Sequence, residues 1–158
     1  KYLDYLIFFR NQNKHYILKI GTEDVYNTAI SINKILENYQ NVILKVDIEG
    51  DEYKVLDQIL NNSNKINTLI IEFHDIHKNI DKIEDFIDRS KELKLIHIHA
   101  NNFAGLNEDG DPNVIELTFT NINKNELSLV KTDKSFPVEQ LDYKNINRIE
   151  DIYLKFYD

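Results

Sequence analysis

Three apolar segments of the chain each end in polar side chains that are two residues apart. Carboxylates and imidazoles can accept a proton, and amides can bind a hydroxyl group, so these residue types suit acid–base chemistry on a ligand. Carboxylates at the end of a buried strand are also costly to desolvate unless a partner or a ligand forms hydrogen bonds with them. The residues are Asp47 and Glu49, then Glu72 and His74, and then His97, His99, Asn101 and Asn102.

Strands and helices are expected to alternate around these residues. Residues 41–49, 66–74 and 93–102 are apolar and rich in β-branched side chains, which is typical of strands covered on both faces. Residues 51–62 and 79–93 carry apolar side chains at helical spacing. This order predicts an α/β fold with a mostly parallel sheet. Ligands bind at the carboxyl edge of such sheets, so the polar residues should meet there in one crevice.

The other segments are expected to complete the sheet. Residues 114–121 form a strand after a link too short for a crossover helix, so this strand should run antiparallel to its predecessor. Residues 16–21 predict a short strand, and residues 25–39 predict a helix. Near the opening of the chain, residues 2–9 fit either a helix end or a strand, and residues 10–15 predict a turn or a loop. Residues 151–158 alternate apolar and polar side chains, which suggests a half-exposed edge strand or a tail.

The carboxylates also have structural interpretations. Asp47 could cap the helix that follows it, and Glu49 could be a solvated turn residue. Glu72 could be a buried carboxylate that is satisfied by pairing with His97.

The imidazoles and amides have structural interpretations as well. His74 and His99 could be core histidines whose ring nitrogens are satisfied by neighbours. Asn101 and Asn102 could simply form a turn, because asparagine tolerates left-handed backbone conformations.

Composition narrows the class of protein. The chain has 158 residues and a net charge of −8, which argues against binding to nucleic acid or to an anionic membrane. It has no cysteine, so it has neither disulfides nor a thiolate metal site, which fits a cytoplasmic location. No apolar run is long enough for membrane insertion.

The chain resembles the C-terminal portion of the FkbM-like family of S-adenosylmethionine-dependent methyltransferases. The similarity covers about residue 25 to the end, and its most specific part is "ILKVDIEGDEYKVL" at residues 43–56. The other motifs occur in the expected order: "LIIEFH", "LIHIHANNF", "PNVIELTFTN", "FPVEQLDYKN" and "DIYLKFYD". The resemblance implies a Rossmann-like class I methyltransferase sheet, mostly parallel with an antiparallel last strand.

The resemblance also implies roles for the polar residues. The expected activity is methyl transfer from S-adenosylmethionine to a hydroxyl of a small-molecule or glycan acceptor. Asp47 and Glu49 would border the cofactor, and His99 or His74 would act as the general base. The acceptor would be bound by the remaining polar residues, Glu72, Asn101 and Asn102.

One departure from the family concerns the cofactor loop. Such methyltransferases carry a glycine-containing first loop, whereas this chain has four glycines and none close enough together to form one. The chain also has no methionine. We therefore expect residues 1–158 to be a single, N-terminally truncated domain that lacks the first two strands of the sheet.

Two other functions stay open. Glu72, His74 and His99 could form a metal site with two histidines and one carboxylate, in a metal-dependent enzyme. The chain could instead be a non-catalytic binding or accessory module that has lost the cofactor loop. The sequence leaves the acceptor and the oligomeric state undetermined.

Overall fold

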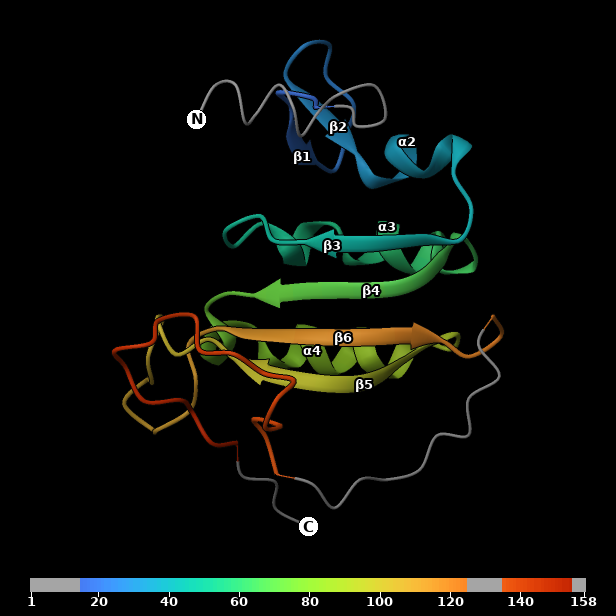
Figure 1. Ribbon diagram of the computed structural model, residues 1–158. Coiled ribbons are helices and arrows are strands. Elements are labelled where there is room, and N and C mark those ends of the chain that lie inside the picture. Colours follow the sequence, from blue (N-terminus) through green and yellow to red (C-terminus); the bar gives the residue numbers. More distant parts are fainter. Residues whose placement is uncertain (1–14, 125–134, 155–158) are drawn as a thin grey trace, which may run out of the picture.

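A four-stranded sheet forms the centre of the protein. The computed structural model describes residues 15–124 and 135–154. The strands of the sheet are β3 (Val42–Val46), β4 (Ile66–Phe73), β5 (Leu93–Ala100) and β6 (Ile115–Asn121). Their order in space is β3-β4-β6-β5 (Figure 1). β3 and β4 pair in parallel, and β6 pairs antiparallel with both β4 and β5. Three strands therefore run in one direction, and the predicted antiparallel strand is confirmed.

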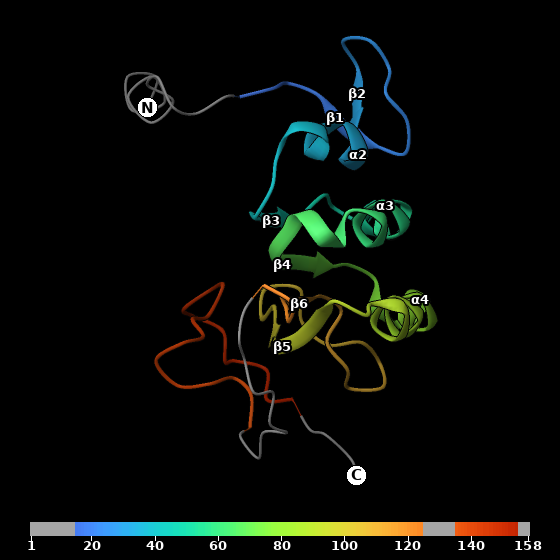
Figure 2. The ribbon, with the colours of Figure 1, turned by 90° about the vertical axis from the view of Figure 1, so that its right-hand side faces the viewer.

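Two helices cover one face of this sheet, as the view along the sheet shows (Figure 2). The helices and the short 3₁₀ turns beside them are η2 (Glu52–Lys54), α3 (Leu56–Asn61), η3 (Ser63–Lys65) and α4 (Ile76–Arg89). Ile83 and Phe86 of α4 are buried at helical spacing, and Phe86 meets Phe119 of β6 edge to face with ring centroids 5.5 Å apart. Burying each such side chain contributes roughly 1.5–3 kcal/mol.

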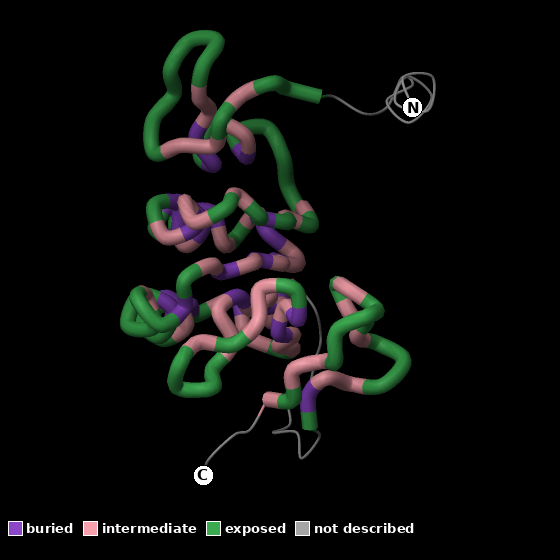
Figure 3. The backbone as a smooth tube through the Cα atoms, turned by 90° about the vertical axis from the view of Figure 1, so that its left-hand side faces the viewer, coloured by how far each residue is buried: buried purple, intermediate pink, exposed green. Residues whose placement is uncertain are grey.

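The core lies between the sheet and these helices, where buried residues gather in Figure 3. Leu69, Ile71 and Phe73 of β4 are all fully buried in it. Successive side chains of a strand point to opposite faces, so Glu72 faces away from the helices. The sheet thus has an apolar helix-covered face and a more polar second face.

Residues 135–154, called here the C-terminal segment, lie on the second face beside β5 (Figures 2 and 3). The side chain of Asn102, just after β5, donates to the carbonyls of Ile146 and Ile149 at 3.0 and 3.1 Å and accepts from the N–H of Ile146 at 3.0 Å. Leu154 forms a single antiparallel bridge with Phe136 inside the segment.

The strand predicted at residues 41–49 is confirmed in part, but the expectation that it is covered on both faces was wrong. β3 is shorter, and its burial alternates, with Ile43 73% exposed and Lys45 also exposed. The C-terminal segment contacts β5 at the other end of the sheet, so this described segment does not cover the second face of β3. Its apolar composition alone could not distinguish one covered face from two.

The predicted helix at residues 25–39 was also wrong in part. β2 (Ala29–Ser31) pairs in parallel with β1 (Lys19–Gly21), and only α2 (Ile32–Ile35) and the 3₁₀ turn η1 (Leu36–Asn38) are helical. Asp24 accepts a hydrogen bond from the Ser31 N–H at 2.8 Å, and Ser31 Oγ caps α2 by accepting from Lys34 N–H. These local bonds fix a strand followed by a capped turn of helix where periodicity suggested one longer helix.

Two predictions fall partly outside the described residues. For the opening of the chain, only residue 15 onward is described, and residues 155–158 of the expected edge strand lie outside. Leu154 supplies only an isolated bridge for that strand. In the described part of the chain, no helix is long and apolar enough to cross a membrane.

Candidate functional site

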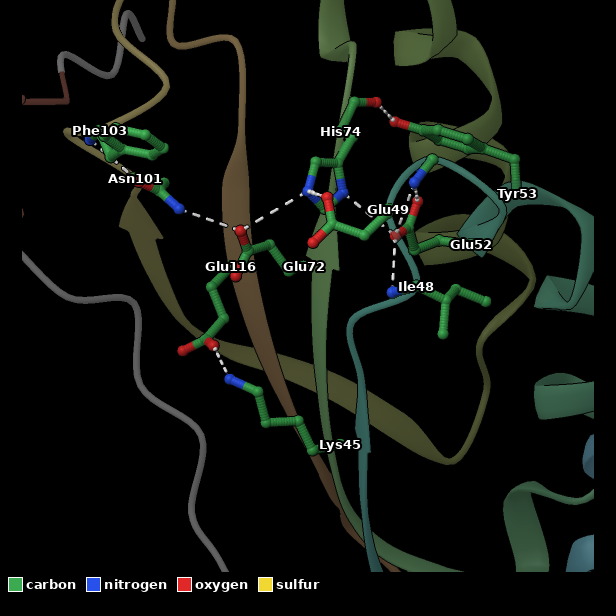
Figure 4. Close-up of polar contacts among 11 residues, drawn as sticks. Lys45, Ile48, Glu49, Glu52, Tyr53, Glu72, His74, Asn101, Phe103 and Glu116 are labelled. Carbon is green, nitrogen blue, oxygen red and sulfur yellow. Dashed lines mark hydrogen bonds and ion pairs between the residues drawn. The ribbon is translucent and has the colours of Figure 1, made fainter. Parts of the chain in front are cut away.

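The carboxyl ends of β3, β4 and β5 lie at one edge of the sheet, because these strands run in the same direction. Figure 4 shows side chains from the three strand ends pointing toward one another at this edge. Glu49 follows β3, His74 follows β4 and Asn101 follows β5, with Glu72 between them. The structure therefore brings together residues that the sequence placed at three separate strand ends.

Glu52 organises the loop after β3. Its carboxylate is fully buried and accepts hydrogen bonds from the Ile48 N–H at 3.1 Å and from the Gly50 N–H at 3.0–3.1 Å. Gly50 has a φ of 98° and Glu49 a φ of 57°, so the loop turns through two left-handed residues. The "DIEGDE" motif is thus a tight turn closed by its own last carboxylate.

His74 lies among carboxylates. Its Nδ1 is 3.1 Å from Glu52 Oε1, and its Nε2 is 3.6 Å from Glu49 Oε2 and 3.8 Å from Glu72 Oε1. An ionised carboxylate can only accept, so a hydrogen bond to ionised Glu52 requires the proton of the His74 ring to be on Nδ1. Tyr53 donates to the backbone carbonyl of His74 at 2.6 Å. Burial, and then the nearby charges of Glu52 and Asp75, raise the pKa of Tyr53, so this hydroxyl stays a donor.

Glu72 does not pair with His97, which corrects one structural interpretation. Glu72 Oε1 accepts from the side-chain amide of Asn101 at 3.0 Å, and Asn101 in turn accepts from the Phe103 N–H at 3.0 Å. His97 instead contacts Asp142 of the C-terminal segment, with 2.7 Å between Nε2 and Oδ1. The sequence could not reveal this partner, which is 45 residues away.

Glu116 is a residue of the site that the sequence analysis missed. It is the second residue of β6 and lies directly opposite Glu72, and Lys45 of β3 donates to its Oε2 at 2.7 Å. This hydrogen bond raises the pKa of the Lys45 ammonium. Antiparallel pairing of residues 114–121 with 66–74 was not predicted, and that register is the signal that would have identified Glu116.

A cavity of about 250 Å³ lies between this edge of the sheet and the C-terminal segment. Its lining residues are Glu72, His99, Asn101 and Glu116 from the sheet, and Leu141, Asp142, Tyr143 and Asn145 from the segment. The lining is mostly polar and rich in carboxylates. Polar groups that converge in one cavity can orient a hydroxylated ligand.

His99 lies in the wall of this cavity. Its Nε2 is buried and has no hydrogen-bond partner among the described residues, and the carboxylate of Asp151 is 3.9 Å away. A buried ring nitrogen without a hydrogen-bond partner is uncommon in folded proteins and often marks a functional site.

Asn102 is not in the cavity wall. It is buried, and both its amide nitrogen and its amide oxygen bond the backbone of the C-terminal segment. This position favours a structural role over the predicted contact with an acceptor.

The predicted metal set is not the one that the described residues bring together. Asp47, Glu52 and His74 each offer a ligand atom, and these atoms lie within 4.8 Å of one another; His99 is not part of this group. Both oxygens of Glu52 already accept backbone hydrogen bonds, and Oε1 also contacts His74. Satisfied oxygens of this kind are poor free ligands. Asp47 and Glu49 are exposed at the end of β3, where they could contact a cofactor.

The fold and this edge define an α/β protein with a polar cavity at the carboxyl ends of its parallel strands. Residues 7–95, more than half of the chain, match the family described as methyltransferase FkbM domain, and the chain belongs to that family. The family predicted from the motifs is thereby confirmed, although the match covers residues 7–95 and not the predicted range from about residue 25 to the end. Neither a curated protein nor a solved structure matches the chain significantly.

Proposed function

We propose that the protein transfers a methyl group from S-adenosylmethionine to a hydroxyl of a sugar or a secondary metabolite. The observation that carries this proposal is the position of His99 in the wall of an acidic cavity at the carboxyl edge of the sheet. Membership of a methyltransferase family supports the reaction class. S-adenosylmethionine, when bound, supplies a methyl group that its sulfonium already activates.

The residues divide into a cofactor side and an acceptor side. The exposed carboxylates of Asp47 and Glu49 suit the hydroxyls and the positive charge of the cofactor. Glu72 and Asn101 are held to each other at 3.0 Å in the cavity wall, where they offer hydrogen bonds to the acceptor. The chain thereby orients the acceptor, and orientation is the larger part of the catalytic task for an activated methyl donor.

His99 is the proposed general base, which takes the proton of the acceptor hydroxyl. His74 is the second candidate. Its Nδ1 is engaged by the buried Glu52, and its Nε2 faces Glu49 and Glu72, so its ring is held in a network of carboxylates. The Nε2 of His99 has no hydrogen-bond partner among the described residues, so its ring is less constrained than that of His74, which favours His99 as the base.

A turnover assay tests the proposal. The natural full-length gene product is incubated with methyl-labelled S-adenosylmethionine and a panel of sugars and hydroxylated metabolites. We expect His99→Ala to lower turnover roughly 10²–10⁴-fold, the usual contribution of a general base, with little change in cofactor affinity. The wild-type rate should also fall at acid pH, where an imidazole ordinarily takes up a proton.

His74→Ala is the matched comparison. Loss of turnover in His74→Ala alone would make His74 the base. Turnover retained in both variants would leave Asp47, Glu49, Glu72 or water as the base. No transfer to any acceptor, together with no binding of the labelled cofactor, would contradict the proposed function.

A further inference from the structure

The C-terminal segment brings one aspartate to each of the two histidines of β5. His97 Nε2 lies 2.7 Å from Asp142 Oδ1, and His99 Nε2 lies 3.9 Å from Asp151 Oδ1. The two histidines are two residues apart, so they lie on the same face of the strand. An imidazole thus faces an aspartate twice in the structure. The contact of His97 with Asp142 is the tight one, and the contact of His99 with Asp151 is the looser one.

Both contacts are well enclosed, since the side chains of His97 and Asp142 are 18% and 6% exposed. The side chains of His99 and Asp151 are only 13% and 10% exposed. The Asp151 carboxylate accepts a hydrogen bond from the N–H of Ile152 at 3.1 Å, which helps to fix its direction. Low exposure strengthens the attraction between an imidazole N–H and a carboxylate, because little water screens it.

Other acidic groups face His99 as well, and each has a partner. Glu116 of β6 is directly opposite His99 and accepts from Lys45. Glu72 of β4 accepts from Asn101, and Asp142 contacts His97. Each of these three carboxylates is engaged by another side chain, whereas Asp151 accepts only the backbone N–H of Ile152 among the described residues, so Asp151 is the carboxylate left to act on His99.

We propose that Asp151 is a positioning residue for His99. Asp151 holds the proton of the neutral ring on Nε2, so the unprotonated nitrogen is Nδ1, the atom that would accept a proton in the cavity. A shift of about 1 Å brings Nε2 and Oδ1 from the present separation to a normal hydrogen bond. When His99 becomes protonated, the same carboxylate stabilises the imidazolium. The catalytic meaning of this arrangement rests on the proposed function.

The test reads the tautomer of His99 directly and needs neither cofactor nor acceptor. Ring ¹⁵N chemical shifts of the labelled full chain, recorded at alkaline pH where the rings are neutral, report which nitrogen carries the proton. We expect His99 to be protonated mainly at Nε2 in the wild type and to lose this preference in Asp151→Ala. The matched variant Asp142→Ala should change the His97 ring and leave the His99 ring unchanged.

Asp151→Asn separates loss of the carboxylate from loss of packing, because it keeps the size of the side chain. Backbone signals of Ile146 and Ile149, which Asn102 holds, show whether the C-terminal segment stays in place. An unchanged His99 tautomer in Asp151→Ala, or an equal change of the His97 ring in both Asp151 variants, would overturn the proposal.

Turnover then separates this proposal from the proposed function. Asp151→Ala should lower kcat and leave KM unchanged. The decrease in kcat should be smaller than the roughly 10²–10⁴-fold decrease expected for loss of the base itself. A tautomer that depends on Asp151 in a protein whose turnover does not depend on His99 would support the positioning contact and refute His99 as the base.

Discussion

The ring Nδ1 of His74 lies 3.1 Å from Oε1 of Glu52, and this contact joins the end of β4 to the loop after β3. Glu52 is fully buried, and its carboxylate also accepts the N–H groups of Ile48 and Gly50 (Figure 4). One side chain thus holds two strand ends at the edge where the proposed cofactor and acceptor sites meet.

Glu52→Ala should destabilise the protein by about 3 kcal/mol or more. The substitution leaves the part-buried N–H groups of Ile48 and Gly50 without their acceptor, and each unsatisfied group that is buried costs about 1–3 kcal/mol. Urea unfolding followed by circular dichroism measures the loss. Glu49→Ala is the control, because Glu49 is 86% exposed and should change the free energy of unfolding by less than about 0.5 kcal/mol. Equal effects of the two substitutions would show that Glu52 does not organise the loop.

Gly50→Ala should cost about 1–2 kcal/mol for a different reason. Gly50 has a φ of 98°, which an L side chain rarely adopts, although an added Cβ would meet no atom within 4 Å. The strain is therefore conformational and not steric. Gly21→Ala, where φ is not in the left-handed region and the nearest atom to an added Cβ is 3.6 Å away, is the matched control. Thermal unfolding of both variants measures the difference, and a neutral Gly50→Ala would contradict the backbone argument.

The residues of the strand ends could be predicted from the sequence, because alternation and strand direction are local signals. The positions of Glu72 and His74 could be predicted from an apolar run and from the rule that ligands bind where parallel strands end, at one edge of the sheet. Asp142 and Asp151 could not be predicted, since they reach β5 through packing of a distant segment, and the alternation at residues 151–158 does not indicate which strand that segment contacts. At residues 25–39 a local signal was misleading, because helical spacing predicted one helix there. The hydrogen bond from the Ser31 N–H to the Asp24 side chain favours a strand followed by a short helix instead.

Asp51 should make the stability of the protein depend on pH in the acid range. Hydrogen bonds from Lys19 and Lys54 lower the pKa of Asp51 from 3.8 to about 2. A carboxyl group with a lowered pKa in the folded state contributes stability above pH 3.8, and this contribution is lost as the pH falls toward about 2. The melting temperature of Asp51→Asn should therefore lie below that of the wild type at neutral pH.

The two melting temperatures should converge as the pH approaches 2. Lys19→Gln should reproduce part of the effect, because Lys19 bonds Asp51 from β1 at 2.8 Å. A constant difference between wild type and Asp51→Asn across this range would exclude Asp51 as the titrating group.

Asn102→Ala should release the C-terminal segment from the sheet. The substitution removes three hydrogen bonds between the buried amide and the backbone of Ile146 and Ile149. Hydrogen exchange should become faster at the Ile146 amide, which donates to Asn102, by about 10-fold or more if at least one net bond of roughly 1.5 kcal/mol is lost. Asn101→Ala is the control, because Asn101 bonds Glu72 and Phe103 and not the segment. Unchanged exchange at Ile146 would show that other contacts hold the segment in place.

Removal of divalent metal should leave methyl transfer unchanged. Asp47, Glu52 and His74 have ligand atoms within 4.8 Å of one another, but Glu52 already uses both oxygens for backbone hydrogen bonds. A cation there would have to displace contacts that hold the loop after β3, which opposes binding. Turnover of the full-length gene product is compared before and after treatment with EDTA, and again after Mg²⁺ or Mn²⁺ is restored. A loss of activity that either cation reverses, and that Asp47→Asn reproduces, would instead assign these residues to a metal-dependent reaction.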